Sequence, residues 1–218
     1  MARRRFRFRK PPSPNGWWRQ CLGVITPLPK LDGPNSRANY VNNRGHVVGS
    51  AENSTPQSNC IFPFQMKPVI WEGDQIKELP TLSGDTQGYA LGINDQGQAV
   101  GWTLSKDSTV FHAVVWKNGA VTDLGSLGGT YSDAFSINNR GQVIGRSNLS
   151  GDLTHHAYLW RKHLGMADLG TLPGDFSSVP WGIDNKGRVV GTSCDASGNC
   201  RAFLWQSGVM TDLNLLYP

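Results

Sequence analysis

The residues of this chain that could bind a metal or move a proton are its histidines, and two of them recur at one place in a pattern. His112 and His156 each stand four residues before a Trp, and His155 precedes the second. A zinc site needs three or four converging ligands, whereas the matching positions elsewhere hold Lys67 and Arg201. The shared property is a long polar side chain on a strand, so we expect no metal and no cofactor here.

Cysteine chemistry is confined to one pair with close spacing. Cys194 and Cys200 bracket the sequence Asp-Ala-Ser-Gly-Asn, which can fold back as a hairpin loop and bring the two sulfurs within bonding distance. The spacing is too long for a zinc pair of the C-x₂₋₄-C type. We therefore predict a disulfide, which favours an oxidising compartment. Cys21 and Cys60 lie in different parts of the chain, and nothing in the sequence places them together.

The sequence contains no motif of a catalytic site. It has no G-x-S-x-G nucleophile elbow, and the acids Asp123, Asp168 and Asp212 occupy one recurring position that holds Glu78 in another copy. The Asx-rich turns hold too few acidic residues for an EF-hand. We predict no catalytic, cofactor-binding or metal residues. An enzyme whose site is assembled from loops at the axis of a propeller would leave no local motif, so a hydrolase or lyase stays open as the alternative.

The positive charge lies at one end of the chain. The formal charge of +5 comes from 21 Lys and Arg against 16 Asp and Glu, but six of the bases stand among the first ten residues, leaving 15 bases and 16 acids in the rest. Nucleic-acid or other anion binding is therefore expected only through this arm, as a second alternative. No apolar segment follows the arginines, so we expect no signal peptide and no membrane span. The arm consists of Arg3, Arg4, Arg5, Arg7, Arg9 and Lys10.

The elements that position these residues are revealed by an internal repeat of about 45 residues. Each unit has a strand-like segment, an Asx-x-x-Gly turn, a second strand ending in Gly, an apolar run ending in Trp, and a Leu-x-x-Leu pair. The turn glycines are Gly45, Gly97, Gly141 and Gly187; the strand glycines are Gly49, Gly101, Gly145 and Gly191; the tryptophans are Trp71, Trp116, Trp160 and Trp205.

This pattern predicts an all-β fold, a β-propeller-like array of four-stranded blades. The turn glycine closes a tight hairpin in the left-handed conformation, the strand glycine allows close backbone approach, and the Trp fills the space between blades. An open β-solenoid or stacked-sheet array is the alternative. We expect a disordered lead-in over 1–16, a partial repeat over 17–37, and one domain of four units over 38–218. The units are 38–89, 90–133, 134–180 and 181–218.

Unit one departs from the pattern through an insertion between its Gly and its Trp. That interval is 22 residues long, against 15, 15 and 14 in the later units. Its apolar residues form a candidate binding loop, although a plain surface loop fits the sequence as well. The candidate residues are Cys60, Ile61, Phe62 and Phe64.

The residues before each Trp also carry a family resemblance. His112-Ala113-Val114, His156-Ala157-Tyr158 and Arg201-Ala202-Phe203 resemble the His-Ala-Phe signature of the HAF-type extracellular repeats of bacteria, and the neighbouring G-I-N and L-G-x-L-x-G elements are similar too. The resemblance covers about residues 23–218 and implies an exported, propeller-like repeat protein. We therefore expect a non-catalytic extracellular protein whose blades act as a scaffold for an unknown protein or glycan partner.

Overall fold

The computed structural model describes residues 27–56 and 64–215, and strands account for nearly all regular structure in them. The prediction of an all-β fold is confirmed. A 3-10 turn, η1 (Leu213–Leu215), follows the last strand, and no helix in the described part of the chain is long enough and apolar enough to span a membrane. The strands are β1 (Ser36–Val41), β2 (Val47–Pro56), β3 (Phe64–Glu72), β4 (Gln75–Glu78), β5 (Asp85–Ile93), β6 (Ala99–Ser105), β7 (Phe111–Lys117), β8 (Ala120–Asp123), β9 (Gly128–Ile137), β10 (Val143–Leu149), β11 (His155–Arg161), β12 (Gly165–Asp168), β13 (Ser177–Ile183), β14 (Val189–Cys194), β15 (Cys200–Gln206) and β16 (Val209–Asp212).

Hydrogen bonds group these strands into three sheets rather than four separate ones. The first sheet holds β1–β4 and the last holds β13–β16, each as an antiparallel meander. The middle sheet has eight strands, because the β5–β8 and β9–β12 meanders are joined by one parallel pair, Phe111 opposite Tyr131. The expectation of independent four-stranded sheets is corrected at this junction. We call the four meanders units 1 to 4.

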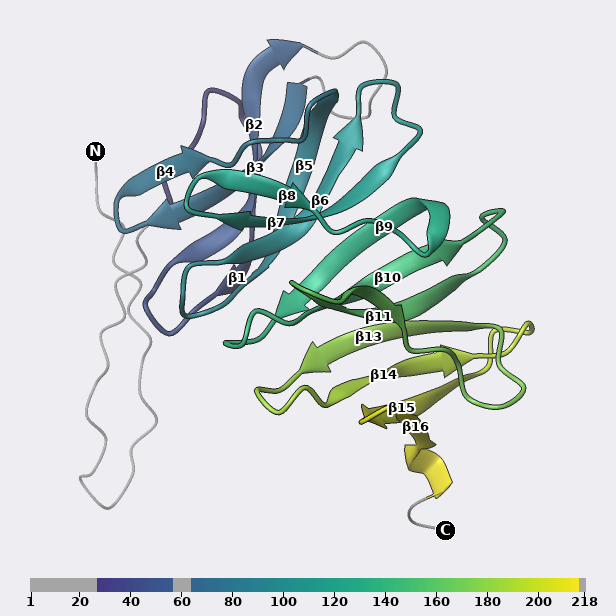
Figure 1. The fold of residues 1–218 in the computed structure, drawn as a ribbon. Helices are drawn as coiled ribbons and strands as arrows, with labels where there is room; N and C mark the ends of the chain where they lie inside the picture. The colour runs from purple at the N-terminus through teal and green to yellow at the C-terminus, as the bar shows by residue number, and fades with distance from the viewer. Residues whose placement is uncertain (1–26, 57–63, 216–218) are drawn as a thin grey trace, which may run out of the picture.

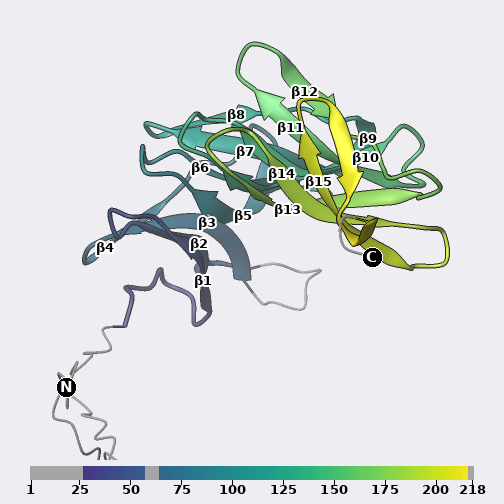
Figure 2. The ribbon, with the colours of Figure 1, turned by 90° about the horizontal axis from the view of Figure 1, so that it is seen from below.

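The units follow one another in chain order along an arc, with unit 1 and unit 4 at opposite ends (Figure 1). The view from below also separates the purple and blue strands of unit 1 from the yellow hairpin of unit 4 (Figure 2). No strand pair among the described residues joins unit 1 to unit 4, so the sheets do not close into a ring.

The recurring turn forms for a local reason. In unit 3 the side-chain Oδ1 of Asn138 accepts hydrogen bonds from the backbone N–H groups of Arg140 and Gln142, at 2.9 and 3.0 Å. Gly141 follows with φ of +73°, a conformation that costs a residue without a Cβ almost nothing. Gly45, Gly97 and Gly187 have the same left-handed backbone.

The same turns also bind one another across the units. Asn42 Nδ2 donates to the backbone oxygen of Asn94 at 2.9 Å, Asn94 Nδ2 to that of Asn138 at 3.0 Å, and Asn138 Nδ2 to that of Asp184 at 2.8 Å. All three asparagines are buried. We call this chain of bonds the asparagine relay. The recurring turn is therefore part of the scaffold, because each copy closes its own hairpin and holds the next unit.

Apolar side chains fill the spaces between neighbouring units. Trp71 and Trp116 are almost fully buried, and their indole N–H groups donate to the backbone oxygens of Pro29 and Pro80. Trp160 and Trp205 pack as half-buried residues at the edges of the next two clusters. Each Trp thus lies on the side of its unit that faces the preceding segment. The cores of the three junctions include Val48, Ile70 and Trp116; Val100, Val143 and Tyr158; and Ile144, Leu159 and Phe203.

Candidate functional site

The structure places the cysteine pair at the free end of the β14–β15 hairpin. Cys194 and Cys200 face each other across the two strands and are joined by a disulfide, with their Cα atoms 4.0 Å apart. The loop between them closes on Asp195, whose carboxylate accepts the backbone N–H groups of Ser197 and Asn199. The disulfide therefore fastens a solvent-exposed hairpin tip.

The histidines at the repeat position pair with acids of their own units. His156 Nδ1 lies 2.9 Å from Asp168 Oδ2, and His112 Nδ1 lies 3.0 Å from Asp85 Oδ2. At the same position Arg201 forms a bond of 2.8 Å to Asp212. Across the described ranges, no three His, Cys, Asp or Glu side chains form a group that could hold a metal. The long polar side chain at this position thus serves to bridge strands.

Two other sequence candidates fall largely outside the described residues. The basic arm from Arg3 to Lys10 lies outside them, as do Cys60, Ile61 and Phe62 of the candidate binding loop. Phe64 is described: it begins β3, is half-buried, and pairs with Pro56 of β2.

A cluster that sequence reasoning missed lies on the strands of unit 3. Tyr131 and Asp133 are on β9, and Arg146 lies opposite Asp133 on β10. The Tyr131 hydroxyl donates to Asp133 Oδ2 at 2.8 Å, and Arg146 Nη2 donates to the same hydroxyl at 3.0 Å. Arg146 Nε stands 3.5 Å from Asp133 Oδ2, and the buried Tyr158 donates to the Asp133 backbone oxygen at 2.9 Å.

Burial sets the electrostatics of this cluster. Asp133 is only 2% exposed, and loss of hydration raises the pKa of its carboxyl to about 6, although Arg146 and the Tyr131 hydroxyl act in the opposite direction. Burial also raises the pKa of Tyr131. Burial, followed by the charge of Arg146, lowers the pKa of His155 on β11. The group therefore contains a buried carboxyl with a raised pKa, a property common at functional sites.

Aromatic rings continue outward from this cluster along one surface. The Arg146 guanidinium lies over the Tyr131 ring at 5.0 Å and over the Phe135 ring at 5.9 Å. Phe135 stacks on Trp181 of β13 with ring centroids 5.9 Å apart, and Trp181 is 63% exposed. We call Tyr131, Phe135, Arg146 and Trp181 the aromatic–arginine face. It joins units 3 and 4 and holds the guanidinium of Arg146 over two aromatic rings.

On the other side of Tyr131 the rings extend into unit 2. Phe111 lies 4.8 Å from Tyr131, Trp102 lies 5.2 Å from Phe111, and Tyr89 stacks on Trp102 at 4.6 Å. These residues belong to four neighbouring strands, β5, β6, β7 and β9.

Asp133 and Arg146 occupy positions where the units differ, which is why the repeat concealed them. Asp133 aligns with Tyr89 in unit 2, and Arg146 aligns with Trp102. Two features of the sequence could have indicated this cluster. Arg146 is a charged residue directly after the strand glycine Gly145, and Asp133 is an acid directly before the Ala-x-x-Ile-Asn segment of the same unit. Neither departure is part of the hairpin motif, so only a column-by-column comparison of the units finds them.

Comparison with known proteins finds likeness in fold. No family model matches the chain, and no curated protein matches it. The β-propeller domain of the Trilobed protease from Pyrococcus furiosus matches with a TM-score of 0.55 and 16% identity, over 82% of this chain and 51% of that one. An acylaminoacyl peptidase from Pyrococcus horikoshii matches with a TM-score of 0.54 and 16% identity, over 82% of this chain and 27% of that one.

A third match is an acylaminoacyl peptidase in complex with Z-Gly-Gly-Phe-chloromethyl ketone. Its TM-score is 0.54 at 17% identity, over 83% of this chain and 27% of that one. The chain thus spans about half the length of the first structure and about a quarter of the other two.

These likenesses support the propeller-like fold and correct the functional prediction. The expected non-catalytic scaffold for a protein or glycan partner is wrong, because the similar structures are a protease domain and peptidases. The alternative expectation, a hydrolase or lyase with a site assembled from loops at the propeller axis, agrees better with these structures than the scaffold does.

Proposed function

We propose that this chain is the propeller part of a peptide-hydrolysing protein, and that its aromatic–arginine face binds the peptide substrate. Each unit is then one blade, a four-stranded meander that buries its faces against its neighbours. The proposal is supported by the peptidase structures of similar fold and by a surface with the chemistry that a peptide needs. The activity of the whole protein belongs to this proposal.

The observation that carries the proposal is the placement of Arg146 beside the Phe135–Trp181 stack. The Arg146 side chain is 35% exposed, while its Nε faces Asp133 and one terminal nitrogen binds Tyr131. The guanidinium is therefore held in one orientation with donors left for a ligand. A peptide offers both matching groups, because its carbonyl or terminal carboxylate oxygens accept from Arg and its apolar side chains pack on the rings.

Asp133 has a positioning role in this proposal. Its carboxyl is too buried to touch a substrate, but it holds Arg146 and accepts from Tyr131. Among the described residues, neither paired histidine bonds to a hydroxyl or thiol through its second ring nitrogen. We therefore assign substrate binding to this part of the chain, and bond cleavage to groups outside the aromatic–arginine face.

The test is peptide binding by the full chain, measured by fluorescence anisotropy with labelled peptides that end in a free carboxylate or an amide. Trp181→Ala removes an exposed ring and should weaken binding at least about fivefold, since ring stacking of this kind is worth about 1 kcal/mol. Tyr40→Ala is the matched control, because Tyr40 is also an exposed aromatic residue but lies on β1 at the far end of the array. Mass spectrometry of the same mixtures reports cleavage.

Saturable binding that Trp181→Ala weakens and Tyr40→Ala leaves intact supports the proposal. The absence of saturable binding to any peptide, or equal losses in both variants, would overturn it. A free carboxylate that improves binding over the amide identifies Arg146 as the contact for the peptide end. Equal binding of the two peptides instead identifies an internal carbonyl as the group that Arg146 recognises.

We also propose the extracellular location that the HAF-type resemblance implies. The Cys194–Cys200 disulfide supports it, because such bonds persist in oxidising compartments. Thiol labelling of the chain in intact cells tests it: protected cysteines at 194 and 200 are the expected result, and reactive thiols there contradict it.

A further inference from the structure

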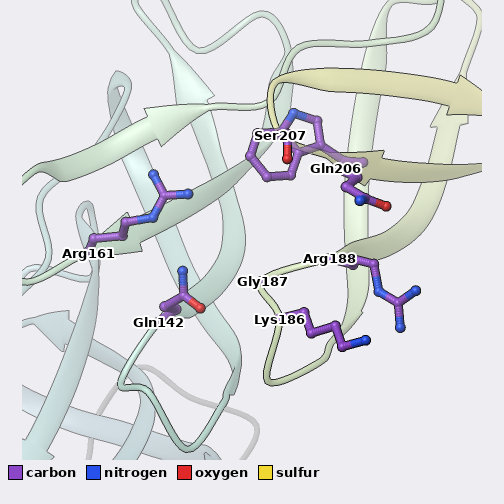
Figure 3. Close-up of a pocket in the computed structure, with 8 residues that line it drawn as sticks. Gln142, Arg161, Lys186, Gly187, Arg188, Gln206 and Ser207 are labelled. Carbon is purple, nitrogen blue, oxygen red and sulfur yellow. The ribbon is translucent and has the colours of Figure 1, made fainter.

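A concave surface lies between units 3 and 4, at the end of the sheets where the Asx turns are. It is a cavity of about 220 Å³ between the turn of unit 3, the end of β11, the turn of unit 4 and the β15–β16 hairpin. Figure 3 shows Arg161 and Gln142 on one side of Gly187, and Lys186 and Arg188 on the other. The lining residues are Gln142, Arg161, Lys186, Gly187, Arg188, Trp205, Gln206 and Ser207.

The charges of this cavity are of one sign. Its lining includes three cations and no acid. In the described part of the chain Arg161 and Lys186 have no ion-pair partner, while the side chain of Arg188 binds Asp184 through Nε, at 2.7 Å. The terminal nitrogens of Arg188 are therefore left to donate. Like charges repel, so these side chains stand apart unless an anion lies between them.

The amide of Gln142 adds an oriented neutral donor. Its Oε1 accepts a hydrogen bond from Asn138 Nδ2 at 2.8 Å, which leaves Nε2 with its two N–H groups. The whole amide lies against Gly187: its Oε1 and Nε2 are 3.1 and 3.2 Å from the position that a Cβ of residue 187 would occupy. The asparagine relay that joins the units thus also fixes which end of Gln142 is the donor.

We propose that this cavity binds a phosphate group of a small molecule or of inorganic phosphate. Three cations with an amide and a hydroxyl supply more donors than a single carboxylate can accept, whereas a phosphate offers three or four oxygens and up to two negative charges. Trp205 in the lining provides an apolar wall beside the anion. We name the residues Gln142, Arg161, Lys186 and Arg188 the oxyanion site.

The oxyanion site is specific to this junction of the repeat. At the preceding junction the matching positions hold Lys117, Arg140 and Gln142, so the third cation is replaced by an amide. At the first junction they hold Glu72, Gln96 and Gln98, and no cation remains. The hairpin fold therefore does not require these charges. The body of the chain is nearly neutral as a whole, and the clustering arises only when units 3 and 4 come together.

The experiment is a titration of the full chain, labelled with nitrogen-15, with inorganic phosphate, phenyl phosphate and acetate at low salt. The indole N–H resonance of Trp205 reports the cavity, and Trp205→Phe assigns it. We expect saturable shifts with both phosphates, a weaker effect of acetate, and loss of affinity as sodium chloride is raised. The double variant Arg161→Gln with Lys186→Gln should lower phosphate affinity at least about tenfold, since it removes two charge-assisted contacts.

The matched control is Lys117→Gln with Arg140→Gln, which removes the same net charge from the equivalent positions of the preceding junction. This control should keep phosphate affinity within about twofold. Equal losses in both double variants mean a general charge effect and overturn the site, as does an indole resonance that none of the anions moves. Circular dichroism establishes that each variant is folded. Tighter binding of phenyl phosphate identifies an organic phosphate as the ligand, and equal binding identifies inorganic phosphate.

Discussion

The side-chain amide of Asn94 donates a hydrogen bond to the backbone oxygen of Asn138, the residue that begins the equivalent turn in the next unit, at 3.0 Å. The Oδ1 atom of the same amide accepts two backbone N–H groups of its own turn. One side chain thus closes a hairpin and joins two units. An acid at this position could perform the first task only, because a carboxylate has no N–H to donate.

Replacing Asn94 by Asp should therefore destabilise the protein by about 1–3 kcal/mol, because a buried carbonyl loses its donor and meets a negative charge. Asn185→Asp is the control. Asn185 Oδ1 accepts from the backbone N–H of Asn139, and an Asp would accept the same bond. Urea unfolding followed by circular dichroism measures both variants. If Asn94→Asp is as stable as Asn185→Asp, the relay contributes nothing.

The raised pKa of Asp133 predicts an unusual pH dependence. A free Asp titrates near about 3.9, whereas burial raises the pKa of Asp133 to about 6 in the fold. Between these values the folded state binds the proton more tightly than the unfolded state, so the contribution of Asp133 to stability is largest below pH 4 and is lost as the pH rises through 6.

Asp133→Asn removes this titration. The difference in unfolding free energy between wild type and variant should then change between pH 4 and pH 7, in the direction that disfavours the wild type at the higher pH. Carboxyls with lowered pKa, such as Asp168 and Asp195, contribute equally to both proteins and cancel. A difference that stays constant with pH would contradict the raised pKa.

Gly145 should tolerate no side chain. A Cβ there would lie 1.8 Å from the backbone oxygen of Asp133 and 2.7 Å from the hydroxyl of Tyr158. Gly145→Ala should therefore cost about 2–4 kcal/mol, since backbone of the neighbouring strand must move. Gly182→Ala is the control, because its Cβ would meet only a methyl group of Val190, at 3.4 Å. Thermal melting of the two variants decides: equal midpoints would refute the steric explanation.

Loss of the Cys194–Cys200 disulfide should weaken the fold only moderately. The bond closes a short loop, for which the chain-entropy relation gives about 2 kcal/mol. Replacing both cysteines by Ser, or reducing the wild type with dithiothreitol, should lower the unfolding midpoint by similar amounts. A wild type insensitive to reductant would show that the bond is absent or contributes nothing to stability.

The sequence was sufficient to predict the scaffold because the scaffold repeats. The Asx turn around Asn138 and Gly141, and the Trp at the end of each third strand, follow from local chemistry that every unit shares. The Phe111–Tyr131 bridge that merges two sheets could not be read in this way. It depends on how units 2 and 3 meet, and no residue type marks that contact.

The candidate sites could not be predicted from the sequence either, because they also depend on how strands and units meet. Asp133 and Arg146 pair across β9 and β10, and the register of that pairing includes bulges that no spacing rule gives. The oxyanion site combines Arg161 with Lys186, residues that belong to different units. The net charge concealed it, because a total over the chain says nothing about which cations a fold brings to one cavity.

The change from Asn to Asp along the recurring turns gives the array a direction. Asp184 accepts from Asn138 through its backbone oxygen, and its side chain binds Arg188 within its own turn. Asp184 therefore accepts a hydrogen bond from the preceding unit, but its carboxylate has no N–H group to donate to a following unit. An engineered array with a further unit after unit 4 would therefore need Asn at position 184, and a repeat built from unit 3 alone would already carry the residue that each added copy requires.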